Sequence, residues 1–217
     1  ITYFEERLTP ATADKAKGFD ATCSFVNDEA NADVIQTLKD GGIKVMLLRC
    51  AGFDSVDLAK TKELGIPVLR VPAYSPESVA EHAAALLQTV NRNTHLGSNR
   101  TKEFNFNITG LMGVALVGKT AGVVGTGKIG KCAVNILRGF GMKVIAYDAF
   151  PDKSSDIEYV TLDELYAKSD VITLHCPLFP ETKHMINKES IAKMKDGVLL
   201  VNTSRGGLIN TEDLLVA

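Results

Sequence analysis

One stretch of the chain, residues 120–148, constrains its fold more than any other. It opens with a short apolar run at residues 121–124, which is typical of a buried β-strand. A G-x-G-x-x-G pattern follows directly, with its glycines at Gly125, Gly127 and Gly130. An amphipathic segment at helical spacing comes next, and residues 143–147 have the pattern of a second buried strand. The stretch therefore predicts a β-turn-α-β unit with the glycines at the strand-to-helix junction.

Each glycine has a physical role in such a unit. Gly125 permits the tight turn, Gly127 lets the backbone approach a pyrophosphate, and Gly130 lets helix and strand pack closely. The N–H groups of the first helical turn then face the anion, with the helix dipole behind them. A glycine-rich turn alone is often only a turn, but with both strands and the helix in register this one predicts dinucleotide binding.

The second predicted strand leads to Asp148, 18 residues after the last glycine of the pattern. A carboxylate at this place accepts hydrogen bonds from the ribose hydroxyls of NAD. The 2′-phosphate of NADP would face the same carboxylate, and two like charges about 4 Å apart repel by roughly 4 kcal/mol at an effective dielectric constant of 20. We therefore expect a preference for NAD(H) over NADP(H).

Composition narrows the class of protein. The chain has 217 residues, a net charge of −2, 23% charged and 45% hydrophobic residues, which is ordinary for a soluble α/β protein of one or two domains. No basic run favours nucleic acid, and no apolar run is long enough to span a membrane. The four cysteines form no C-x-x-C pair, so we expect no metal site and no disulfide framework, but reduced thiols in a cytoplasmic protein.

Strand-like and helix-like segments alternate along the chain, which predicts parallel sheets. Expected strands lie at residues 21–26, 44–48, 67–71, 170–174 and 198–201, and expected helices at 31–38, 56–64, 77–95, 160–167 and 188–194. Ser75 is expected to cap the long third helix, with Pro76 at its first position. The predicted fold class is α/β, with two Rossmann-like, doubly wound parallel-sheet domains.

Residues 91–107 mark a shift to polar composition, so we place a domain boundary near Asn99. This gives a first domain of residues 1–100 and a second of residues 101–217. Both ends of the chain lie inside predicted elements, a strand at residues 1–6 and a helix at residues 211–217, without cap or stop signals. We therefore expect the chain to be a fragment of a longer protein.

In open α/β sheets, ligands lie beyond the carboxyl ends of the strands, and three such ends here have unusual polar residues. One is the segment after Val201, which contains Arg205 among small residues. A guanidinium there stays charged and fits a carboxylate bidentately. Position alone leaves two interpretations open: an arginine that binds substrate beside the cofactor, or a surface arginine paired with a nearby acid.

The second strand end is His175-Cys176-Pro177. We interpret His175 as a hydrogen-bonded scaffold residue rather than a proton donor, because a histidine at a strand end is more often part of the scaffold. Cys176 and Pro177 are expected to place backbone against the dinucleotide.

The third strand end belongs to the other predicted domain. Ala51 and Gly52 have little side chain, so their N–H groups are candidates to reach a bound carboxylate. Tyr74 offers a phenol to the same site, although a tyrosine there often only packs. His82 lies on the apolar face of its helix and is expected in the core.

Five motifs occur along the chain in order: RCAGFDSVDLA, VPAYSPESVAEHA, GKTAGVVGTGKIG, SDVITLHCPL and VNTSRGGLI. In this order and spacing they resemble the D-isomer-specific 2-hydroxyacid dehydrogenases over the whole chain. The resemblance implies a smaller, flavodoxin-like domain that holds the substrate and a second domain that holds NAD. It also implies reversible hydride transfer between NADH and pyruvate, giving D-lactate. Two alternatives stay open: a dehydrogenase for a bulkier 2-keto acid or for 3-phosphoglycerate, and a non-catalytic NAD(H)-sensing protein of the corepressor type.

The resemblance also implies roles for single residues. Arg205 corresponds to the catalytic arginine that orients the 2-keto acid and polarises its carbonyl, Ala51 and Gly52 bind the carboxylate, and Tyr74 borders the substrate and favours a small one. The implied cofactor-binding residues are Gly125, Gly127, Lys128, Ile129, Gly130, Asp148, Cys176, Pro177, Thr182, Thr203 and Ser204.

Two features of the family lie outside the matched motifs. Its acid/base histidine and the glutamate that tunes it lie C-terminal of the arginine, and 12 residues follow Arg205, so we expect neither residue here and no turnover by this chain alone. His175 and His184 do not match that histidine.

The family usually forms homodimers through the NAD domain, and residues 101–116 are the candidate arm for this contact.

Overall fold

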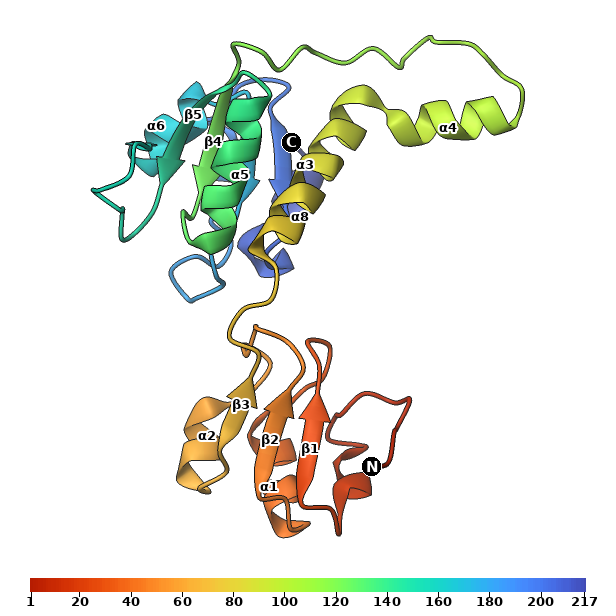
Figure 1. Ribbon diagram of the computed structural model, residues 1–217, viewed down its shortest axis with the longest axis vertical. Coiled ribbons are helices and arrows are strands. Elements are labelled where there is room, and N and C mark those ends of the chain that lie inside the picture. Colours follow the sequence, from red (N-terminus) through yellow and green to blue (C-terminus); the bar gives the residue numbers. More distant parts are fainter. The chain divides into compact units, whose positions relative to one another are not determined.

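The structure, a computed structural model, describes all residues from Ile1 to Ala217 and divides into two compact units, Ile1–Tyr74 and Ser75–Ala217. Each unit contains one parallel sheet with helices packed against it, which confirms the predicted α/β class (Figure 1). No helix of the chain combines the length and the apolar character needed to cross a membrane.

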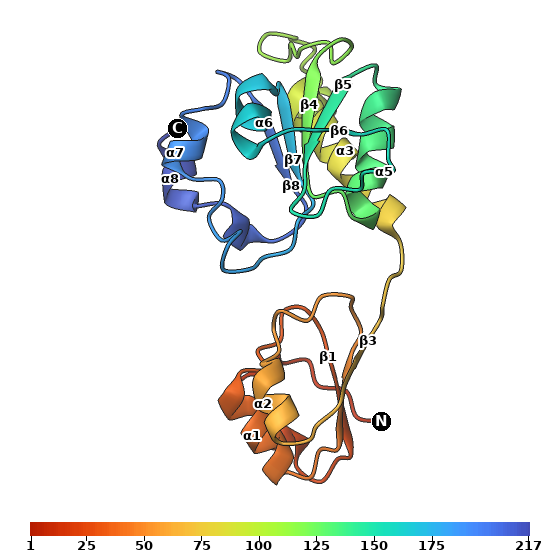
Figure 2. The ribbon, with the colours of Figure 1, turned by 90° about the vertical axis from the view of Figure 1, so that its left-hand side faces the viewer.

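The first unit is built on a 3-stranded parallel sheet in the order β1-β2-β3. Its strands and helices are β1 (Ala21–Ser24), α1 (Ala32–Asp40), β2 (Val45–Leu48), α2 (Leu58–Glu63) and β3 (Val68–Arg70), after a 3-10 turn at Ala13–Ala16. Helices α1 and α2 lie on the same face of the sheet (Figure 2), where Ile35 and Leu38 of α1 form a core with Met46 of β2. The opposite face exposes Cys23, Leu47 and Leu69, which lie side by side in register.

The second unit is built on a 5-stranded parallel sheet in the order β6-β5-β4-β7-β8. Its strands are β4 (Thr120–Val124), β5 (Lys143–Tyr147), β6 (Glu158–Tyr159), β7 (Val171–Leu174) and β8 (Leu199–Asn202). The chain leaves β4 toward β5 on one side and later adds β7 on the other side, so this unit is doubly wound. The carboxyl ends of β4 and β7 mark the point where the strand order reverses, which is where such sheets bind ligands.

Helices cover both faces of this second sheet (Figure 2). Helices α3 (Pro76–Arg92) and α5 (Lys128–Gly139) lie on one face, and α6 (Leu162–Lys168) lies on the other. Alternate residues of β4 follow this division: Ala121 and Val123 pack toward α3 and α5, and Val124 packs toward α6. Because both faces are covered, the central strands β5, β4 and β7 form nearly continuous apolar runs instead of alternating.

Helix α3 explains why the division of the chain differs from the predicted boundary near Asn99. Ser75 caps it by accepting a hydrogen bond from the Ser78 N–H, and Pro76 is its first residue, as predicted. The helix packs on α5 and β8, so the compact units separate before it, between Tyr74 and Ser75. It ends at Arg92, earlier than predicted, because Asn93 adopts a left-handed conformation (φ 51°).

Four further features of the structure differ from what the sequence led us to expect. Residues 1–6 form no strand and are exposed, since no neighbouring strand pairs with them. His82 is exposed, because Ala83 and Leu87 of α3 face the core in its place. Strand β6 was not predicted, because two residues give no periodic pattern. The last helices are short: α7 covers Lys188–Ile191 and α8 covers Thr211–Leu215.

The arm at residues 101–116 begins at the end of α4 (Thr94–Lys102) and runs outside the sheet before the chain enters β4 (Figure 1). Asn91 of α3 anchors its far end, since the Asn91 side-chain amide donates to the Val114 carbonyl and accepts from the Val114 N–H, both at 2.9 Å. Arg100 donates to the carbonyls of Asn107 and Thr109. Much of the apolar surface of the arm is exposed, at Phe104, Phe106, Ile108 and Met112.

Candidate functional site

The glycine-rich loop follows β4 and contacts the carboxyl ends of the two neighbouring strands, β5 and β7. Gly125 follows β4 with a φ of 90°, a conformation that strongly favours glycine. A Cβ atom at Gly125 would lie 2.8 Å from the Cys176 nitrogen and from the His175 carbonyl carbon, so the loop also needs glycine for space. The Gly125 N–H donates to the Tyr147 carbonyl at the end of β5. The loop is therefore held against both neighbouring strand ends.

The other two glycines of the pattern differ in their surroundings. A Cβ atom at Gly130 would lie 1.9 Å from the Gly125 carbonyl oxygen, so α5 and the loop touch backbone to backbone there. A Cβ atom at Gly127 would meet no protein atom within 4 Å. Gly127 is the N-cap of α5, and no side chain caps that helix end. The first N–H groups of α5 therefore lack a side-chain acceptor, which fits the binding of a pyrophosphate.

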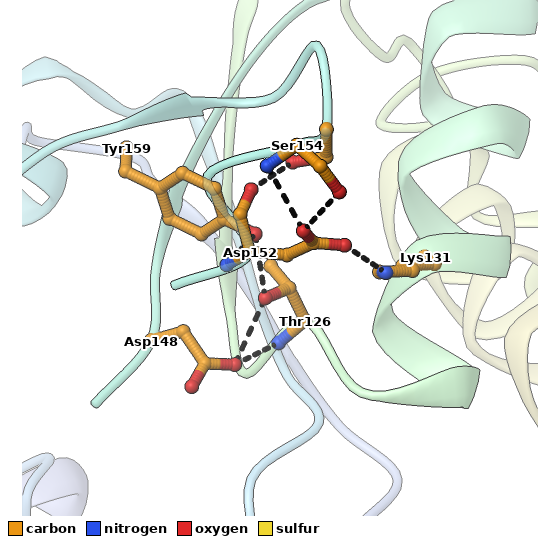
Figure 3. Close-up of polar contacts among 7 residues, drawn as sticks. Thr126, Lys131, Asp148, Asp152, Ser154 and Tyr159 are labelled. Carbon is orange, nitrogen blue, oxygen red and sulfur yellow. Dashed lines mark hydrogen bonds and ion pairs between the residues drawn. The ribbon is translucent and has the colours of Figure 1, made fainter. Parts of the chain in front are cut away.

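Asp148, the residue after β5, is held in a fixed orientation (Figure 3). Its Oδ2 accepts hydrogen bonds from the Thr126 N–H at 2.6 Å and the Thr126 hydroxyl at 2.9 Å. Its Oδ1 accepts one from the Phe150 N–H at 2.8 Å. Partial burial raises the pKa of this carboxyl group, but the hydrogen bonds from Thr126 and Phe150 lower it by more, so the net pKa lies below 3.8. Asp148 is therefore an ionised acceptor at neutral pH.

The residues that hold Asp148 were not predicted from the sequence. Thr126 occupies a variable position of the glycine pattern and is buried, and Tyr159 lies on the short strand β6 with its hydroxyl 2.9 Å from the Thr126 hydroxyl. Lys131 of α5 pairs with Asp152 at 2.6 Å, and this ion pair together with hydrogen bonds from Ser154 lowers the pKa of Asp152 to about 2. The only available signal was the place of Thr126 between two glycines.

His175 follows β7, and its backbone contacts the glycine-rich loop at Gly125. Its Nε2 lies 3.0 Å from the Thr173 hydroxyl, and its buried Nδ1 has no hydrogen-bond partner in the chain. Burial lowers the pKa of His175 to about 4, so the ring is neutral at physiological pH. A half-buried, neutral ring beside the loop backbone supports the scaffold interpretation over that of a proton donor.

The free energy of unfolding is expected to depend on the protonation of His175. Its pKa is about 4 in the folded chain and 6.5 in the reference state, so between these values the unfolded chain binds more protons. The resulting stability is fully present above pH 6.5 and falls as the pH falls, by up to about 3 kcal/mol near pH 4. Urea denaturation of the wild type and of His175→Gln from pH 7 to pH 4 measures this difference. Parallel pH profiles for the two proteins would contradict it.

The loop after His175 is shaped by its own side chains. The Cys176 thiol lies 3.7 Å from the Met185 sulfur, and burial raises the pKa of this thiol. The Thr182 hydroxyl donates to the Pro177 carbonyl at 2.8 Å and accepts from the Phe179 N–H. The Thr182 side chain therefore closes the loop on itself, and Pro177 is exposed beside it.

The segment after β8 brings a fourth strand end to the same edge of the sheet. The Ser204 hydroxyl donates to the Leu174 carbonyl at 3.0 Å, which ties the ends of β7 and β8 together. The Thr203 hydroxyl is buried without a partner. Arg205 is half-buried, and its Nη1 donates to the Ser204 carbonyl at 3.1 Å. Except for Asp148, every predicted cofactor residue of this unit lies on or beside the loops after β4, β7 and β8.

The first unit holds the remaining predicted site residues. Ala51 and Gly52 are half-buried in the loop after β2, and their carbonyls are both engaged. The Arg70 guanidinium donates to the Ala51 carbonyl at 2.8 Å and lies over the Phe53 ring, and the Cys50 thiol donates to the Gly52 carbonyl at 3.2 Å. The carbonyls are thus turned to the protein. Tyr74 is 70% exposed at the end of this unit.

Comparison with known proteins identifies the family. The model of the D-isomer specific 2-hydroxyacid dehydrogenase NAD-binding domain matches residues 84–217. The chain belongs to this family. Among curated relatives of this dehydrogenase chain, a D-lactate dehydrogenase of Escherichia coli is 49% identical over 100% of the chain and 67% of its own length. A 2-hydroxyacid dehydrogenase homolog of Haemophilus influenzae is 51% identical over 98% of the chain and 65% of its own length.

Solved structures agree with the fold of this 2-hydroxyacid dehydrogenase chain. A D-lactate dehydrogenase from Aquifex aeolicus, in complex with NAD and lactic acid, is 39% identical with a TM-score of 0.85, over 94% of the chain and 62% of that protein. The chain thus spans about two thirds of the length of the relatives it matches. Residues 84–217 match the NAD-binding domain of this family, which confirms the predicted cofactor class.

Proposed function

We propose that this chain supplies the NAD-binding and substrate-binding parts of an NAD-dependent D-lactate dehydrogenase, which reversibly reduces pyruvate to D-lactate with NADH. One observation supports this most strongly: the glycine-rich loop and an ionised, oriented Asp148 meet at the strand-order reversal of a sheet in this family. The unit Ile1–Tyr74 is proposed to bind substrate and the unit Ser75–Ala217 to bind the cofactor.

Cofactor binding is proposed to rest on backbone and carboxylate groups. Gly125, Gly127 and Gly130 shape the loop, and the N–H groups of Lys128 and Ile129 at the start of α5 receive the pyrophosphate. Asp148 accepts from the adenosine ribose. Cys176, Pro177, Thr182, Thr203 and Ser204 are proposed to line the rest of the dinucleotide. When bound, NADH supplies the hydride.

Substrate binding is proposed to use one guanidinium and two backbone N–H groups. Arg205 is held by its neighbouring backbone, and its charge is suited to orient a 2-keto acid and to polarise the carbonyl that receives the hydride. Ala51 and Gly52 are proposed to bind the carboxylate through their N–H groups, because their carbonyls are occupied by Arg70 and Cys50. Tyr74 is proposed to border a small substrate.

A panel of 2-keto acids tests this function in the full-length protein. We expect the highest kcat/KM for pyruvate with NADH, and a decline for 2-ketobutyrate, 2-ketoisocaproate and phenylpyruvate. A maximum at a bulky acid or at 3-phosphohydroxypyruvate would move the assignment to another dehydrogenase of this family. Tight NADH binding without turnover of any acid would favour an NAD(H)-sensing protein instead.

We propose that a second copy of the chain is the partner of the arm. Phe104, Phe106 and Met112 are 86%, 75% and 91% exposed, and residues of this kind in one segment mark an interface. The anchor at Asn91 holds the arm in place without covering these side chains. A homodimer would remove them from water.

Replacing Phe104 and Phe106 by Asp is expected to dissociate the dimer, with a dissociation constant raised by about a hundredfold or more because two buried aromatic anchors are lost. Sedimentation equilibrium of the full-length protein measures this. Phe150→Asp is the matched control, because Phe150 is 91% exposed but lies outside the arm. A wild-type protein that is monomeric at micromolar concentration would contradict the proposal.

A cytoplasmic location is also proposed. All four cysteines are free, and Cys50 is buried while Cys132 and Cys176 are partly so. Free thiols are usual in a reducing compartment. Cell fractionation that finds the protein outside the cytoplasm would contradict this location.

A further inference from the structure

A chain of hydrogen bonds ends at the carboxylate of Asp148 (Figure 3). We call it the Tyr159 relay. It runs from the Asp152 N–H to the Tyr159 hydroxyl at 3.3 Å, from there to the Thr126 hydroxyl at 2.9 Å, and on to Asp148 Oδ2 at 2.9 Å. Its members come from the loop after β4, the loop after β5 and strand β6. Only Asp148 has a role in the proposed function.

The direction of each hydrogen bond in the relay follows from the number of protons. Ionised Asp148 can only accept, so the Thr126 hydroxyl uses its one proton to donate to it. The Thr126 oxygen must then accept from Tyr159, whose hydroxyl in turn accepts from the Asp152 N–H. All donors therefore point toward Asp148, and successive hydrogen bonds of this kind polarise one another.

The relay also ties down the loop that follows Asp148. The Asp152 N–H meets Tyr159, and the Asp152 carboxylate pairs with Lys131 of α5 at 2.6 Å and accepts from the Ser154 hydroxyl and N–H. At the other end of the loop, the Phe150 N–H donates to Asp148 Oδ1. Both oxygens of Asp148 are thus engaged, and rotation of its carboxylate would break three hydrogen bonds.

We propose that Thr126 and Tyr159 are positioning residues that hold the Asp148 carboxylate in place and thereby set the preference for NAD over NADP. This rests on the proposed function, in which Asp148 meets the adenosine ribose. A 2′-phosphate is accommodated only if the carboxylate turns away or is neutralised, since two like charges at contact distance repel. The relay opposes both changes. Lys131, a cation on the adjoining helix, is committed to Asp152 and does not offset the repulsion.

Direct binding of NADH and NADPH to the full-length protein, followed by calorimetry, tests this proposal without requiring turnover. Tyr159→Phe is expected to weaken NADH binding about fivefold and to leave NADPH binding within about twofold, so the preference falls about fivefold. Thr126→Val removes a hydrogen bond to a charged group, and the preference is expected to fall about tenfold or more. Thr126→Ser keeps the hydroxyl, so its preference for NADH over NADPH should stay within about twofold of the wild type.

Tyr147→Phe is the matched control. It makes the same chemical change on the neighbouring strand β5, where the Tyr147 hydroxyl makes no hydrogen bond within the chain and the ring packs into the core beside α6. An equal loss of both nucleotides in Tyr159→Phe, or an unchanged preference in Tyr159→Phe and Thr126→Val, would overturn the positioning role while leaving NAD binding intact. A wild type that binds neither nucleotide would instead contradict the proposed cofactor site, and the positioning role with it.

Discussion

Arg205→Lys is expected to lower kcat/KM for pyruvate about a hundredfold in the full-length protein, and Arg205→Ala about a thousandfold. Lysine keeps the charge but loses the planar pair of N–H donors that fits a carboxylate or a developing alkoxide. NADH affinity should change by less than about twofold, because the proposed contacts of Arg205 are with substrate and strengthen in the transition state. Steady-state kinetics and NADH titration measure the two effects separately.

Arg138→Lys is the control for this substitution. Arg138 lies on α5 and pairs with the exposed Asp156 at 3.0 Å, and surface ion pairs of this kind contribute little. Its replacement should leave kcat/KM unchanged. If Arg205→Lys behaves like Arg138→Lys, Arg205 is a surface arginine paired with an acid, which is the alternative that its position in the sequence left open.

Gly130→Ala is expected to destabilise the second unit by about 3 kcal/mol or more and to weaken NADH binding about a hundredfold. The added Cβ would lie 1.9 Å from the Gly125 carbonyl oxygen, and neither backbone segment can move without displacing α5 from the loop. The N–H groups at the start of α5 would then no longer be placed for a pyrophosphate. Urea denaturation and NADH titration measure the two effects.

Substitutions at two other glycines distinguish an effect on folding from an effect on nucleotide binding. At Gly127 an added Cβ meets no protein atom within 4 Å and the backbone is extended, so Gly127→Ala should fold normally and weaken only nucleotide binding. At Gly139, the last residue of α5, the added Cβ is also unobstructed, and Gly139→Ala should stabilise the chain by about 0.5 to 1 kcal/mol. Equal effects of Gly130→Ala and Gly139→Ala would contradict the close approach of helix and loop.

Local patterns predicted the elements around the glycine-rich loop. The apolar runs of β4 and β5, the helix between them and the place of Asp148 all lie within one short stretch, so each is specified by its own neighbours in sequence. Capping signals were equally local, since Ser75 and Pro76 start α3 as predicted. Such features depend on backbone chemistry within a few residues, which a sequence displays directly.

Features that depend on tertiary contacts were not predictable in the same way. The division before α3 follows from the packing of that helix on α5 and β8, whereas the composition changes only after it. The end of α3 depends on the left-handed conformation of Asn93, a residue that is also acceptable inside a polar helix. The contact between Thr126 and Tyr159 joins residues 33 positions apart, through a strand of two residues. None of these leaves a periodic signal.

In the candidate site too, residues marked by local sequence were predicted, and residues that act through tertiary contacts were not. Gly125, Asp148 and Arg205 stood out because each comes shortly after a buried strand, and the structure places them in the loops after β4, β5 and β8. The partners that orient Asp148 and that occupy the Ala51 carbonyl, namely Thr126, Tyr159 and Arg70, did not stand out. Supporting residues of this kind are recognised by geometry, because many residue types at many positions are able to supply a hydroxyl or a guanidinium.

The product that the full-length protein forms from pyruvate and NADH is the decisive measurement. We expect NADH oxidation that depends on pyruvate, is much slower with NADPH, and yields D-lactate as the only enantiomer by chiral chromatography. Formation of L-lactate, or NADH binding without pyruvate reduction, would contradict the assignment of this chain to a D-lactate dehydrogenase.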